Sequence, residues 1–182
     1  MITVKQLRAL EKAALQKGIL PEQLMETAGK KVATLIRAKY SLVDTHIVIF
    51  AGTGNNGGDG FVVAKHMATE NPVMVLFFGT VESLSYDARK KYDEIKDTIP
   101  VLIIENPNDV QQYHPQSNLH LLLIDALLGI GLEGKVREPI ASAITQFNEL
   151  QGEKISIDIP SGMNADTGEV LGGCCNADLI MT

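Results

Sequence analysis

Short apolar runs rich in β-branched residues alternate along the chain with longer segments whose apolar residues recur every three or four positions. The short runs are typical of buried strands, and the longer segments are typical of amphipathic helices. Strands are expected at residues 47–51, 73–78, 101–104, 119–124, 155–157 and 177–182. Helices are expected at residues 3–17, 21–40, 58–68, 85–98 and 139–150, and residues 106–117 are expected to form a loop with one helical turn.

This alternation predicts an α/β fold, a Rossmann-like three-layer sandwich with a mostly parallel central sheet and helices on both faces. Two of the expected helices precede the first strand, so the architecture carries two N-terminal helices. A length of 182 residues fits one domain, residues 1–182, with a full hydrophobic core.

A glycine-rich stretch follows the first expected strand. Gly52, Gly54 and Gly57 satisfy the G-x-G-x-x-G spacing between a strand and a helix. Glycine permits a positive φ and a close approach of backbone to ligand, and a helix N-terminus offers free N–H groups to an anion. A dinucleotide-binding motif also needs an acidic residue after the second strand, but Glu82 comes late and beyond a turn. The Asp59 carboxylate would repel a bare phosphate, so we expect recognition of further polar groups; the alternative is a tight turn that Asp59 caps.

Two more aspartates, Asp125 and Asp158, directly follow expected strands, and Asp59 lies just beyond the first strand. Ligands of open parallel sheets bind at the carboxyl ends of the strands. We therefore expect the three carboxylates to share one crevice, where crowding changes their pKa values and leaves one suited to proton transfer. The alternative for each aspartate is a helix cap or a loop hydrogen bond.

Composition excludes several classes of function. The net charge is −6 without a run of basic residues, which disfavours nucleic acid or an anionic membrane as the main partner. No apolar stretch is long enough to span a bilayer. The adjacent Cys174 and Cys175 form neither a disulfide framework nor a zinc site, so a cytoplasmic location is expected. Ser161 lacks the surroundings of a hydrolase nucleophile.

Three motifs together resemble the YjeF N-terminal domain family, the NAD(P)HX epimerases. They are residues 51–60 (Ala-Gly-Thr-Gly-Asn-Asn-Gly-Gly-Asp-Gly), residues 125–139, which begin Asp-Ala-Leu-Leu-Gly-Ile-Gly, and residues 156–162 (Ser-Ile-Asp-Ile-Pro-Ser-Gly). Residues 24–29 resemble the family's N-terminal helix signature, with Thr27 where asparagine is usual. The resemblance spans residues 3–182. It implies an isomerase that interconverts the R and S epimers of hydrated NADH and NADPH, so that a separate dehydratase can restore the cofactor.

The resemblance also implies site residues. Two segments would bind the substrate's phosphates and nicotinamide ribose: Asn55, Asn56, Gly57, Gly58 and Asp59 in the first, and Gly129, Ile130, Gly131, Leu132, Glu133, Gly134 and Lys135 in the second. Asp158 would lie against the hydrated ring as the principal proton shuttle, with Asp59 as the second catalytic candidate. Asn56, Asp125 and Ser161 would bind one potassium ion per subunit, and such an oxygen donor set suits a hard cation. No redox cofactor is expected, because NAD(P)HX is the substrate.

Further expectations come from the family. They are a homodimer, cooperation with a dehydratase that is fused in some members, and a C-terminus truncated before a further strand and helix. The family fold also serves non-catalytic scaffold and protein-binding domains, which is the alternative function. Retention of Asn56, Asp59, Asp125 and Asp158 favours the enzyme. A redox dehydrogenase is disfavoured by the missing acidic residue after the second strand.

Overall fold

The computed structural model describes residues 4–115, 119–132 and 134–182. The strands are β1 Thr45–Ala51, β2 Val73–Phe78, β3 Val101–Ile104, β4 His120–Ala126, β5 Glu153–Ile157 and β6 Leu179–Met181. The helices are α1 Val4–Gln16, α2 Pro21–Lys39, α3 Asn55–Met67, α4 Tyr86–Ile95 and α5 Ile140–Glu149, with the 3₁₀ helices η1 Val81–Ser83 and η2 Pro107–Gln112.

The strands form one sheet in the order β3-β2-β1-β4-β5-β6. Each neighbouring pair of these described strands is parallel, so the sheet is more uniform than the mostly parallel one expected. The order reverses between β1 and β4, and ligands of doubly wound sheets bind outside the carboxyl ends of the strands at such a reversal. The fold therefore directs attention to the segments that follow β1 and β4.

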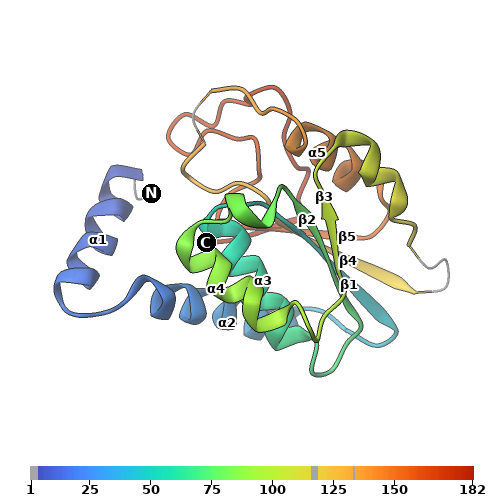
Figure 1. Ribbon diagram of the computed structural model, residues 1–182, viewed down its shortest axis with the longest axis horizontal. Coiled ribbons are helices and arrows are strands. Elements are labelled where there is room, and N and C mark those ends of the chain that lie inside the picture. The colour runs from blue at the N-terminus through green and yellow to red at the C-terminus, as the bar shows by residue number, and fades with distance from the viewer. Residues whose placement is uncertain (1–3, 116–118, 133) are drawn as a thin grey trace.

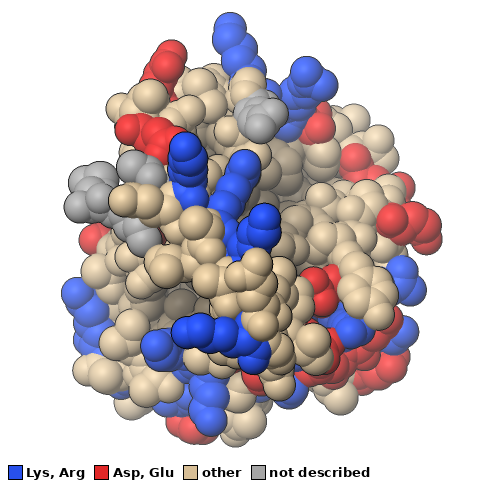
Figure 2. Space-filling model, turned by 90° about the vertical axis from the view of Figure 1, so that its left-hand side faces the viewer, with Lys and Arg blue, Asp and Glu red and all other residues tan. Residues whose placement is uncertain are grey.

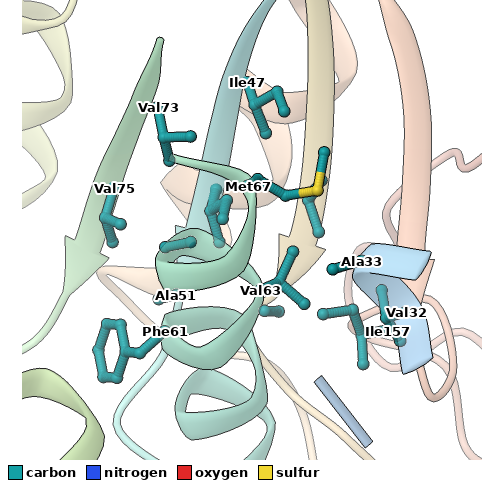
Figure 3. Packing of buried hydrophobic residues seen from close by; sticks show 14 of the residues in the cluster. Val32, Ala33, Ile47, Ala51, Phe61, Val63, Met67, Val73, Val75 and Ile157 are labelled. Carbon is teal, nitrogen blue, oxygen red and sulfur yellow. The ribbon is translucent and has the colours of Figure 1, made fainter. Parts of the chain in front are cut away.

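Two layers of helix cover the sheet, which confirms the three-layer α/β sandwich (Figure 1). Alternate side chains of β1 point to opposite faces: Ile47 and Ile49 join the cluster under α2, α3 and α4, whereas Val48 and Phe50 join the cluster under η2 and α5. Figure 3 shows α3 lying on the first face, with its apolar side chains between the strands and α2. Burial on both faces explains why the strands are continuously apolar.

Helix α1 lies apart from these layers. None of the residues 4–16 that form it is buried, and Figure 1 shows it standing beside the sandwich. The Val4 N–H donates to Asp166 Oδ1 at 3.1 Å, which ties α1 to the loop after β5. On this side of the molecule, lysine and arginine side chains cross the middle of the surface, and many acidic side chains lie toward the right-hand edge (Figure 2).

Most predicted elements are present, but two boundaries differ in ways that matter for function. Helix α3 begins at Asn55, three residues before the predicted start at Gly58, so both asparagines are helical. Strand β4 continues to Ala126, so Asp125 lies within the strand rather than after it. Thr3 and residues 116–118, at the ends of an expected helix and loop, are outside the described residues. Within the described part of the chain, no helix is long and apolar enough to cross a membrane.

Candidate functional site

The glycine stretch forms a tight junction between β1 and α3 rather than a flexible loop. A Cβ atom on Gly57 would lie 1.9 Å from the Gly52 carbonyl oxygen, and one on Gly52 would lie 2.0 Å from the Leu127 carbonyl oxygen. Close backbone approach therefore requires these glycines, as predicted, but the neighbour is the chain itself. The freedom of glycine to adopt a positive φ is not used here, because none of the five glycines from 52 to 60, all described, has one.

Asn56, in the first turn of α3, crosses to the segment that follows β4. Its side chain is 7% exposed, and its Nδ2 donates to the Leu128 carbonyl at 2.9 Å. The Asn56 Oδ1 atom is buried and has no hydrogen-bond partner among the described residues. An unsatisfied buried acceptor is costly, so this oxygen is suited to a donor or cation that binds there.

Asp125 lies in the interior and accepts four hydrogen bonds. Its Oδ1 accepts from the Leu127 N–H at 3.1 Å and from the Ser161 hydroxyl. Its Oδ2 accepts from the Ser156 hydroxyl and the Ser161 N–H, both at 2.8 Å. Burial raises the pKa of Asp125, and the bonds from Ser161, Ser156 and Leu127 oppose that rise. The expectation that Asp125 opens into a crevice is wrong, because the side chain has no exposed surface.

Ser161 connects this interior carboxylate to Asn56. It is fully buried, donates to Asp125 and accepts from the Leu128 N–H at 2.8 Å. Asn56 binds the carbonyl of that same Leu128, so two of the three expected potassium ligands contact one residue. The third, Asp125, is hydrogen-bonded to Ser161. Among the described residues, no group of three or more His, Cys, Asp or Glu side chains could hold a metal. A cation here would therefore rest largely on amide, hydroxyl and carbonyl oxygens, which suits a hard ion.

Asp158 directly follows β5, as predicted, with a φ of 70° that non-glycine residues rarely adopt. Its Oδ2 accepts from the Ile130 N–H at 2.9 Å. Burial raises the pKa of Asp158, and the bond from Ile130 opposes that rise. A Cβ atom on Gly129 would lie 2.8 Å from this Oδ2 and 3.4 Å from Asn56 Cβ. The absence of a side chain at Gly129 thus brings the asparagine and the aspartate close together.

Asp59 is the electrostatic neighbour of Asp158. It lies in α3 and is partly buried. Burial, together with the negative charges of Asp158 and of Glu11 on α1, raises the pKa of Asp59 to about 7. A carboxyl group with this pKa can give and accept a proton near neutral pH. The charge of Asp158 thus acts on Asp59, whereas the third expected member, Asp125, is enclosed in the interior.

The other predicted substrate-binding residues fall into different surroundings. Asn55 is exposed, and its Oδ1 accepts from Ser85 Oγ at 2.9 Å. Gly58 packs against α2, since a Cβ atom there would lie 2.5 Å from the Met25 sulfur. In the predicted second segment Gly129, Ile130 and Leu132 are half-buried, whereas Gly131, Gly134 and Lys135 are exposed. Glu133 is outside the described residues.

Sequence reasoning missed three contributors to this site. Ser156 reaches Asp125, the Leu128 peptide joins Asn56 to Ser161, and the Ile130 N–H holds Asp158. Ser156 carried a signal, because it is a polar residue inside an apolar strand, two positions before Asp158. The backbone groups of Leu128 and Ile130 left no signal in the sequence, since every residue has such groups.

Comparison with known proteins identifies the family of the chain. The family described as "YjeF-related protein N-terminus" matches residues 21–182. The chain belongs to this family. The chain is 33% identical, over its full length, to the "NAD(P)H-hydrate epimerase" of Nitrosopumilus maritimus, of which it spans 83%. It is 35% identical to the "Bifunctional NAD(P)H-hydrate repair enzyme Nnr" of Methanopyrus kandleri, again over its full length, but spans only 36% of that protein.

A solved structure agrees with the fold. The crystal structure of a yeast protein superposes with a TM-score of 0.83, covering 99% of this chain and 78% of the yeast chain at 24% identity. At that identity the likeness concerns the fold alone. Membership in the YjeF N-terminal family confirms the resemblance that the sequence motifs indicated.

Proposed function

We propose that this domain epimerises R- and S-NAD(P)HX, the hydrated forms of NADH and NADPH, in the repair of nicotinamide cofactors. The proposal is carried by the pair Asp59 and Asp158, two partly buried carboxylates with raised pKa at the switch point of the sheet. Support also comes from relatives that are named epimerases or repair enzymes. Those names do not favour the alternative of a non-catalytic scaffold.

Epimerisation at C6 of the ring requires one bond of this hemiaminal carbon, to the ring nitrogen or to the hydroxyl oxygen, to break and to form again with the opposite configuration. Loss of the hydroxyl is the route proposed, and ring opening needs the same exchange of one proton. We propose that Asp158 is the principal shuttle. As the acid it protonates the leaving hydroxyl, which departs as water, and as the base it takes a proton from the water that adds to the other face. The same proton returns to the enzyme, so the cycle balances. Because Asp59 and Asp158 repel each other when both are ionised, the pair retains a proton near neutral pH.

A potassium ion, one per subunit, is proposed near these carboxylates. The buried Asn56 Oδ1, which has no partner among the described residues, supports it. Further support comes from the Ser161 hydroxyl, which contacts the same Leu128 peptide as Asn56 and donates to the Asp125 carboxylate. When bound, the ion would supply a fixed positive charge beside the substrate. The chain's own contribution is to hold its oxygen ligands at the junction of three segments.

The substrate's phosphates are proposed to bind at the first turn of α3 and along residues 129–135. The first N–H groups of a helix have no intrahelical partner and attract anions. Basic side chains on the α1 side of the molecule (Figure 2) add a local positive charge, although the chain carries −6 overall. This local field suits a phosphate-bearing substrate. A cytoplasmic homodimer that hands its product to a dehydratase completes the proposal.

The decisive experiment follows the R epimer. R-NADHX is supplied with a dehydratase specific for the S epimer, and the recovery of ring absorbance is recorded with potassium or sodium as the cation. We expect rapid recovery with the wild-type chain in potassium, slower recovery in sodium, and loss of recovery with Asp158→Asn. Glu149→Gln, an exposed carboxylate on α5, is the matched control and should behave as wild type. A folded wild-type chain that does not accelerate recovery would rule out the enzyme.

A further inference from the structure

Ser156 is the cross-strand partner of Asp125. The register of β4 and β5 sets the two residues opposite each other, and the Ser156 hydroxyl donates to Asp125 Oδ2 at 2.8 Å. Ser156 has no exposed surface, so no substrate touches its hydroxyl. Any effect of this serine on the reaction has to travel through Asp125.

Asp125 in turn holds two consecutive amides of the segment after β4. It accepts directly from the Leu127 N–H at 3.1 Å. Through Ser161, whose Oγ donates to Asp125 and accepts from the Leu128 N–H, it also holds the next amide. Two residues further on, the Ile130 N–H donates to Asp158 Oδ2 at 2.9 Å. Hydrogen bonds at residues 127, 128 and 130, joined by the backbone of that short segment, thus connect the interior to the proposed proton shuttle.

We propose that Ser156 is a positioning residue for Asp158: it orients the Asp125 carboxylate, which fixes the segment 127–130 and with it the amide that holds Asp158. The inference rests on the proposed function only in treating Asp158 as the reacting group. The hydrogen-bonded connection itself is a property of the folded chain, with or without substrate.

The physical reason lies in the number of donors around Asp125. Each carboxylate oxygen accepts two hydrogen bonds, which together fix the rotation of the carboxylate plane. Without the Ser156 hydroxyl, Oδ2 loses its one hydroxyl donor and keeps the Ser161 N–H, a weaker restraint on the plane. Buried hydrogen bonds polarise and reinforce one another, so the bonds to Leu127 and Ser161 would weaken as well. The Ile130 N–H would then lose its fixed position beside Asp158.

Three variants test this connection. Ser156→Ala removes the hydroxyl, and we expect kcat to fall about tenfold with KM nearly unchanged, because the chemical step is affected rather than substrate binding. Ser156→Thr keeps the hydroxyl but adds a methyl group to a site without free space, so it should lower the melting temperature while keeping kcat near the wild-type value. Ser142→Ala, on α5, is the matched control and should change neither quantity.

A second measurement does not depend on activity. The amide resonance of Ile130 and its hydrogen exchange are followed by NMR in the substrate-free protein, in sodium and in potassium. We expect faster exchange and a shifted resonance in Ser156→Ala in both salts, and near-wild-type behaviour in Ser156→Thr.

The outcomes separate cleanly. Loss of kcat in proportion to the fall in melting temperature for both variants would overturn the inference, as would an unchanged Ile130 amide in Ser156→Ala. If the wild-type chain has no epimerase activity, the proposed function fails, and the Ile130 amide alone still decides whether the connection exists.

Discussion

Two groups of carboxylates at neighbouring strand ends have opposite surroundings. The interior group consists of Asp125, which accepts four hydrogen bonds. The rim pair consists of Asp59 and Asp158, and in this pair Asp158 accepts one hydrogen bond, from the Ile130 N–H. Burial raises the pKa in both groups. In the interior group, the hydrogen-bond donors stabilise the ionised form of Asp125. In the rim pair, the negative charge of Asp158 adds to the rise in the pKa of Asp59.

The comparison teaches that position at a strand end does not decide the role of an aspartate. The number of hydrogen-bond donors that face the carboxylate decides that role. A carboxylate with all its acceptor sites filled is a structural anchor, whereas one with few donors and a charged neighbour exchanges protons in the neutral range. Each prediction below changes one side of this comparison.

The largest effect is expected for Asp158→Asn. The amide can still accept from the Ile130 N–H but cannot transfer a proton, so kcat should fall on the order of 10²-fold or more. Asparagine also tolerates the positive φ of this position, and the melting temperature should be maintained. Steady-state kinetics and calorimetry on the same preparation check both statements. A variant that keeps wild-type kcat would exclude Asp158 as the shuttle.

Asp125→Ala is expected to affect stability most. It leaves the hydroxyl and amide donors of Ser156, Ser161 and Leu127 without an acceptor in the interior, at a cost of about 3 kcal/mol in the free energy of unfolding. Urea denaturation measures this loss. Glu149→Ala, which removes an exposed carboxylate, should stay within about 0.5 kcal/mol of wild type. Equal losses for the two variants would contradict the anchoring role.

Asp59 makes stability depend on pH in the opposite sense to an ion-paired carboxylate. Its pKa rises from the ordinary value of 3.8 to about 7 on folding, so the folded state binds the proton more tightly. That contribution to stability is complete below pH 3.8 and is lost as the pH rises through about 7. Between about pH 5 and 8 the wild-type chain should lose about 2 kcal/mol from this group. Asp59→Asn should remove most of this dependence, which denaturation at several pH values would show.

Gly129→Ala gives the smallest predicted change. Its Cβ atom would lie 2.8 Å from Asp158 Oδ2, which forces the carboxylate or the segment to move by a few tenths of an ångström. We expect kcat to fall about tenfold, with a small change in stability. Gly173→Ala is the matched control, because a Cβ atom there would lie no closer than 3.8 Å to a neighbour and the residue is outside the proposed substrate-binding segments. Equal activity of both variants would show that the rim pair tolerates displacement.

The sequence was sufficient to predict the layers and the carboxyl ends of most strands, because apolar periodicity is a local property. The roles of Asp59 and Asp158 stay predictions. The start of α3 was misplaced, because a run of glycines and asparagines resembles a loop. Tertiary contacts explain the helix there: Gly57 packs against Gly52, and Asn56 binds Leu128. The burial of Asp125 and the bond from Ile130 could not be predicted, because both depend on which segments the sheet order brings together.

The pairing of β1 with β4 also sets when activity can appear during folding. These strands are neighbours in the sheet, yet two strands and two α-helices separate them in the chain. The candidate site spans this pair, with Asn56 and Asp59 after one strand and Leu128 and Ile130 after the other. Contacts between distant segments form late, since the intervening loop has to close first. Recovery of catalysis during refolding would therefore report the pairing of β4 with β1. A fragment that ends before β4 would contain Asn56 and Asp59 but not the residues they face, and it should be inactive.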